Sequence, residues 1–75
     1  MEKYGNKNGD SGISGYEIGG NFILIEFSTG SIYEYTYSSA GTNNIEMMKN
    51  LAISGNGLNG FINTYVKFKY SRKIR

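Results

Sequence analysis

The sequence predicts an α+β fold, a small antiparallel β-meander of about three strands followed by two helices. The first observation is a change of hydrophobic period: apolar and aromatic residues alternate before residue 38 and recur every three to four residues after residue 43. The second is that glycines stand where strands should reverse and helices should stop. The third is size, because 75 residues make one domain with a single small core.

The first residues show no apolar period. Residues 1–12 combine Gly5, Asn6, Asn8 and Gly9 with charged side chains. Segments of this composition bury too little apolar surface to offset the entropy of ordering. We therefore expect a flexible leader over residues 1–12 and the folded domain over residues 13–75.

Three segments read as strands. Residues 13–18 form a short candidate strand that Gly19 and Gly20 close. Residues 21–27 are rich in aromatic and β-branched side chains and too short for a helix, so they predict the central strand. The returning strand, residues 31–37, carries tyrosine at every second position.

The hairpin loop decides which face the tyrosines occupy. A three-residue loop over residues 28–30, with Gly30 in the left-handed position, pairs Phe27 with Ser31. Tyr33 and Tyr35 then share a face with Ile25 and Ile23 and belong mainly to the core. A two-residue loop would instead place them beside Glu26 and Leu24. We favour the first register, because Ile23, Ile25 and Phe27 form the more apolar face.

Helical spacing begins after residue 42. Asn43 is a candidate N-cap with Glu46 completing a capping box, Thr42 is the competing cap, and Gly55 is the expected stop. The apolar positions of this helix are Ile45, Met48, Leu51 and Ala52. A second helix follows Gly57, and its apolar face is formed by Leu58, Phe61, Ile62, Tyr65 and Val66.

Charge is distributed unevenly along the chain. Residues 1–38 carry two lysines against five acidic residues, a net charge of −3, whereas residues 39–75 carry six basic residues against one acid, a net charge of +5. Five of these positive charges follow the second predicted helix, within residues 67–75. Such a basic helix exit attracts polyanions, or it serves as a solvated tail that keeps the protein soluble.

Composition argues against several classes of function. The chain has no cysteine and no histidine, so it lacks thiolate and imidazole ligands for a metal and a base to activate a serine. Glu17, Glu26 and Glu34 read as solvated strand charges, and the glycines at 55, 57 and 60 lack the Walker lysine. We expect no enzymatic activity and no cofactor. With no apolar run of about 20 residues and no signal-peptide core, we expect a cytoplasmic protein.

The ordered motifs resemble the KTSC domain family, named for its occurrence at the C-terminus of some lysyl-tRNA synthetases. The match runs from about residue 13 to residue 74, although the stretch between Ser54 and Asn63 is longer than in the commonest version of the family. The motifs that carry it are Phe27-x-x-Gly30-x-x-Tyr33-x-Tyr35, then Ala52-x-Ser54, then Gly57-Leu58-Asn59-x-Phe61-Ile62-Asn63-x-x-Val66-Lys67-x-x-Tyr70. Many members are freestanding bacterial or phage proteins of this size. The family is generally described as of unknown function with a suspected role in RNA binding.

Three binding functions follow as hypotheses. The first is binding of RNA or another nucleic acid by the basic helix exit with aromatic support. The second is a phage-type sponge that sequesters a small, for example cyclic, nucleotide in an oligomeric pocket, where the glycine-loop amides around residues 55–60 and the N-terminus of the second helix hold the anion. The third is a protein-interaction or assembly module in which Phe22, Leu24 and Ile32 bury against a second copy, and we expect a homo-oligomer. The candidate ligand-binding residues are Tyr33, Tyr35, Gly57, Asn59, Asn63, Lys67, Lys69, Arg72 and Lys73.

For each candidate residue a purely structural role is the competing interpretation. Tyr33 and Tyr35 then place their hydroxyls at the rim of the core, and Asn59 and Asn63 cap or brace the second helix.

Overall fold

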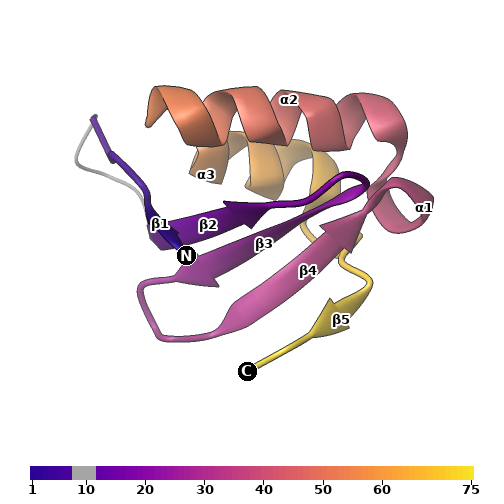
Figure 1. Ribbon diagram of the computed structural model, residues 1–75, viewed down its shortest axis with the longest axis horizontal. Coiled ribbons are helices and arrows are strands. Elements are labelled where there is room, and N and C mark those ends of the chain that lie inside the picture. Colours follow the sequence, from indigo (N-terminus) through magenta and orange to yellow (C-terminus); the bar gives the residue numbers. More distant parts are fainter. Residues whose placement is uncertain (8–11) are drawn as a thin grey trace.

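A computed structural model describes residues 1–7 and 12–75 and confirms the α+β class. One antiparallel sheet in the order β1-β2-β3-β4-β5 is covered on one face by the helices (Figure 1). The strands are β1 (Glu2–Lys3), β2 (Ile13–Ile18), β3 (Phe22–Phe27), β4 (Ile32–Thr36) and β5 (Arg72–Lys73). The helices are α1 (Tyr37–Ala40), α2 (Thr42–Ser54) and α3 (Leu58–Phe61), which continues as the π-helix η1 (Ile62–Val66).

The predicted hairpin register is confirmed. The Phe27 amide donates to the Ser31 carbonyl at 2.8 Å, and Gly30 in the turn has a φ of 95°. Tyr35 pairs with Ile23, and Tyr33 pairs with Ile25. Because paired residues share a face of the sheet, both tyrosines point towards the helices.

The core lies between this face and the helices. It unites the apolar side of β3 with the apolar stripes of both predicted helices, as the spacing of these residues predicts. Its fully buried large side chains are Tyr35, Ile23, Ile25, Ile45, Met48, Leu58 and Val66. Tyr65, expected on the same stripe, is 58% exposed instead. The change from α to π geometry at residue 62 widens the turn and shifts later residues around the helix.

The start of α2 differs from the prediction. The helix begins at Thr42 behind Gly41, and no side chain caps it, so the expected box between Asn43 and Glu46 is absent there. A capping box forms instead at the start of the preceding helix, α1. There the Ser39 amide donates to the Thr36 hydroxyl, and the Thr36 amide donates to the Ser39 hydroxyl. Gly55 ends α2 in the left-handed conformation, as expected.

The expected leader must be corrected for residues 2–7; residues 8–11 lie outside the described residues. Glu2 and Lys3 add strand β1 to the edge of the sheet, and Tyr4 is only 3% exposed. The Tyr4 hydroxyl accepts a hydrogen bond from the Leu58 amide at 3.2 Å. No apolar period is visible in these residues, because a single buried tyrosine makes no pattern.

The basic segment must also be corrected, because it does not leave the domain as a helix exit. After η1 the chain turns back, and Arg72–Lys73 pairs with Tyr33 and Glu34 of β4 as strand β5 (Figure 1). Two ion pairs hold this strand, Arg72 with Glu34 at 3.1 Å and Arg75 with Glu26 at 2.9 Å. The Ser71 hydroxyl and the Arg72 guanidinium together lower the pKa of Glu34.

The outer face of the sheet is partly covered by the chain itself. Phe22 lies over the β2–β3 turn so closely that a Cβ on Gly19 would meet its ring at 2.0 Å. Ile32 is only 9% exposed, and Leu24 is half-buried. None of the helices in residues 1–7 and 12–75 is long and apolar enough to span a membrane.

Candidate functional site: an aromatic cavity beside the C-terminal helix

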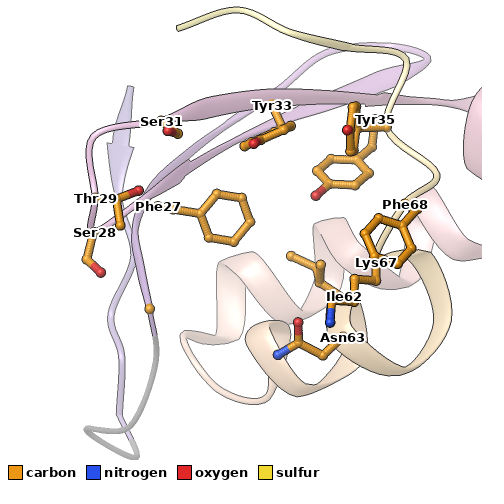
Figure 2. Close-up of a pocket in the computed structure, with 12 residues that line it drawn as sticks. Phe27, Ser28, Thr29, Ser31, Tyr33, Tyr35, Ile62, Asn63, Lys67 and Phe68 are labelled. Carbon is orange, nitrogen blue, oxygen red and sulfur yellow. The ribbon is translucent and has the colours of Figure 1, made fainter.

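A cavity of about 430 Å³ opens between the β3–β4 hairpin and the C-terminal helical segment (Figure 2). Its size falls within the range of small-molecule sites, about 300–1,000 Å³. Four of the nine predicted site residues line it, namely Tyr33, Tyr35, Asn63 and Lys67. The other lining residues are Gly12, Phe27, Ser28, Thr29, Ser31, Ile62, Phe68 and Tyr70. None of these described residues is acidic.

Aromatic rings form the sheet side of the cavity. Tyr33 stands edge-on to Phe27, with ring centroids 5.7 Å apart, and to Tyr70, at 4.7 Å. Tyr70 also contacts Tyr35 edge-on at 6.3 Å. Each ring is therefore held by its neighbours, which preserves the shape of this wall without a bound molecule.

Tyr35 is the polar group that is buried deepest in this wall. The residue is 2% exposed, and burial raises the pKa of its hydroxyl to about 12, with smaller contributions from Tyr33 and Tyr70. No described residue accepts or donates a hydrogen bond at this hydroxyl. The structure has no unpartnered side-chain oxygen that is sealed from solvent among the described residues, so the Tyr35 hydroxyl must open into the cavity that it lines.

The helical side of the cavity carries a different set of groups. Ile62 and Asn63 come from η1, and Lys67 and Phe68 follow directly after it. Figure 2 shows these side chains across the cavity from Phe27, Tyr33 and Tyr35. Phe68 is 79% exposed, more than any other large apolar side chain of the described residues. The cavity thus combines ring faces with one amide and one ammonium group.

The basic residues divide into two groups. Arg72 and Arg75 are neutralised by Glu34 and Glu26. No carboxylate of residues 1–7 or 12–75 lies within ion-pair distance of Lys67, Lys69 or Lys73. Lys73 lies 5.9 Å from the centroid of the Tyr33 ring, and Lys67 lies 5.4 Å from that of Phe68, so two of these lysines contact aromatic rings.

The glycine loop is not part of this site. Gly57 and Asn59 do not line the cavity, and the Leu58 amide between them is already bonded to the Tyr4 hydroxyl. Gly57 has a φ of 83°, which explains a glycine there by backbone geometry alone. α3 spans four residues, and the chain supplies a partner for its first amide, so the predicted anion site at its start has no geometric basis.

Sequence reasoning missed two exposed aromatic residues of the site, Phe68 and Tyr70. The signal that identifies them is the alternation of basic and aromatic side chains from Lys67 to Tyr70. Phe27 was expected in the core; it packs at the core edge and lines the cavity.

Comparisons with protein-family models, with curated proteins and with solved structures find no match for this chain. The resemblance to the KTSC domain family therefore stays a prediction, and the geometry of the site carries the functional argument.

Proposed function

We propose that this protein is a non-enzymatic module that binds single-stranded nucleic acid, RNA in the first place. One observation carries the proposal. Exposed aromatic rings lie next to lysines that have no carboxylate partner among the described residues. Phe68 and Tyr70 stand beside Lys67 and Lys69 in the chain, and β5 adds Lys73 at the Tyr33 ring. Bases stack on such rings for about 1–3 kcal/mol each, and lysines bind the phosphates.

The structure changes which basic residues of the segment 67–75 are expected to bind phosphate. Arg72 and Arg75, part of the basic segment expected to bind phosphate, hold β5 to the sheet through their ion pairs. Lys67, Lys69 and Lys73 are the cations of that segment that remain for a ligand. A footprint of three phosphates implies a slope of log affinity against log salt of about −2, at about −0.7 per contact for single strands.

The test compares two double variants with the same loss of charge. Lys69→Gln with Lys73→Gln should weaken binding of a single-stranded RNA about tenfold at physiological salt and make the salt slope shallower by about 1.4. Lys3→Gln with Lys7→Gln is the control, because β1 forms the opposite edge of the sheet from β5. Fluorescence anisotropy with a labelled RNA measures both quantities. Equal losses in the two variants, or no RNA binding by the unmodified protein, would contradict the proposal.

A free nucleotide is the second candidate ligand, because the cavity has the volume of a small-molecule site and a tyrosine hydroxyl that opens into it. The expected homo-oligomer also stays a prediction. The outer face of the sheet is partly covered by the chain itself. Sedimentation over a range of protein concentrations would measure the oligomeric state directly.

A further inference from the structure

The cavity has features that stacking of bases on exposed rings does not need. A ligand held only by exposed rings and lysines needs no cavity and no hydroxyl on a buried side chain. Here a hydroxyl on a side chain that is 2% exposed opens into a volume of about 430 Å³ without a hydrogen-bond partner among the described residues. Because this hydroxyl is reached from the cavity and has no partner among the described residues, it can offer its hydrogen bond to a molecule that enters the cavity.

We infer that the cavity holds one unstacked nucleobase, with the Tyr35 hydroxyl and the Asn63 carboxamide at its hydrogen-bonding edge and Lys67 at its phosphate. This inference rests on the proposed function and names the part of the nucleic acid that enters the site. The same chemistry describes a base of an RNA strand and a base of a free nucleotide.

The lining matches the three parts of a nucleotide. Phe27, Tyr33 and Phe68 offer ring surface to a flat heterocycle. Asn63 provides both a donor and an acceptor, the combination that reads the paired groups on the edge of a base. The Tyr35 hydroxyl is protonated at neutral pH, as tyrosine hydroxyls with a pKa of about 10 or above are, and it can therefore donate.

The position of Lys67 indicates how a nucleotide would be oriented in the cavity. Lys67 lies at the helical wall together with Asn63, and Phe68 beyond it is exposed, so the cationic side adjoins the open edge of the cavity. The ring wall of Phe27, Tyr33 and Tyr35 lies opposite, on the sheet (Figure 2). A base inserted between the two walls leaves its sugar and phosphate on the lysine side, where a strand continues towards Lys69 and the aromatic segment.

The hydroxyl can be removed without disturbing the packing. Tyr35→Phe keeps the ring and its edge-on contact with Tyr70, and it deletes a group that has no partner among the described residues. We expect an unchanged or higher melting temperature and binding weaker by about threefold to tenfold, the usual worth of one hydrogen bond. Asn63→Ala should weaken binding by a similar factor. Tyr16→Phe, on the same sheet face but outside this cavity, and Asn50→Ala, on the exposed side of α2, are the matched controls.

The ligands are chosen to separate the base from the backbone. The probes are single strands of about eight nucleotides, abasic strands of the same length and sugar, and the four nucleoside monophosphates, each titrated by calorimetry or NMR. The expected result is that base-bearing strands bind more tightly than abasic strands and that only the base-bearing ligands respond to Tyr35→Phe.

Two results separate this inference from the proposed function. If abasic strands bind as tightly as base-bearing strands and Tyr35→Phe has no effect, the base pocket is refuted while nucleic-acid binding stands. If only mononucleotides bind, and Tyr35→Phe weakens them, the pocket stands with a free nucleotide as its ligand and strand binding is refuted. Binding of none of the probes overturns both.

Discussion

Replacing Gly55 with alanine is expected to lower the free energy of unfolding by about 3 kcal/mol. Two costs add at this position. Gly55 has a φ of 76°, a left-handed conformation that costs an alanine about 1–2 kcal/mol. The new Cβ would also lie 3.1 Å from the Cα of Gly5, which is backbone and cannot rotate away. Overpacking of this kind typically costs about 1–3 kcal/mol more.

Gly57→Ala separates the two costs. Gly57 is also left-handed, with a φ of 83°, but its added Cβ would meet only a Leu51 methyl group at 3.8 Å. This variant should therefore lose only about 1–2 kcal/mol. Thermal unfolding followed by circular dichroism measures the difference, since 1 kcal/mol shifts the midpoint of a domain of this size by about 4–8 °C. Equal shifts for the two variants would show that the close approach of the new Cβ to Gly5 costs no stability.

The contact between Gly5 and Gly55 is part of a link between the first residues of the chain and the helices. The Lys7 amide donates to the Gly55 carbonyl at 2.7 Å, and Tyr4 bonds to Leu58 just beyond. Residues 4–7 thus join the end of α2 to the start of α3. Because η1, which continues α3, carries one wall of the cavity, a bulky side chain at Gly55 should also weaken ligand binding in proportion to the loss of folded protein.

Alkaline pH is expected to destabilise the protein by about 2 kcal/mol between pH 10 and pH 12 through Tyr35 alone. Its pKa is about 12 in the folded protein and close to the ordinary value of 10 in the unfolded chain. Between these two values the unfolded state has already lost the proton that the folded state keeps. The stabilising contribution is therefore complete below pH 10 and is lost as the pH rises towards 12.

Tyr35→Phe should remove most of this alkaline dependence, because phenylalanine cannot ionise. Tyr37→Phe should remove a smaller part: the Tyr37 hydroxyl donates to Glu46 at the surface, which raises its pKa in the same direction. Urea unfolding at a series of pH values gives the free energies. A slope between pH 10 and pH 12 that is the same in wild type and Tyr35→Phe would be incompatible with a tyrosine buried at this position.

Much of the fold follows from local pattern. The three-residue loop, with glycine at its left-handed position, set the register, and the register set the face of both tyrosines. Helical spacing located α2 and α3, and Gly55 marked the end of α2. These features depend on neighbours within a few residues, so a single sequence contains them.

The edge strands were not predictable in the same way. β1 and β5 are two residues each, too short to show any period, and they exist because the sheet offers unpaired edges to nearby chain. The basic segment was read as a helix exit because charge patterning does not reveal that Glu34 and Glu26 lie within reach of Arg72 and Arg75. That proximity joins residues 38 and 49 positions apart in the sequence.

The candidate site shows the same division. The sequence by itself determined the aromatic and basic residue types, the sheet face of Tyr33 and Tyr35, and the helical placing of Asn63. Only the tertiary structure decided that Tyr35 is buried with its hydroxyl open to a cavity, that Lys67 joins this cavity, and that Gly57 and Asn59 do not. The physical reason is that a cavity is the space left between a strand and a helix from distant parts of the chain, and its shape depends on how they pack rather than on either segment alone.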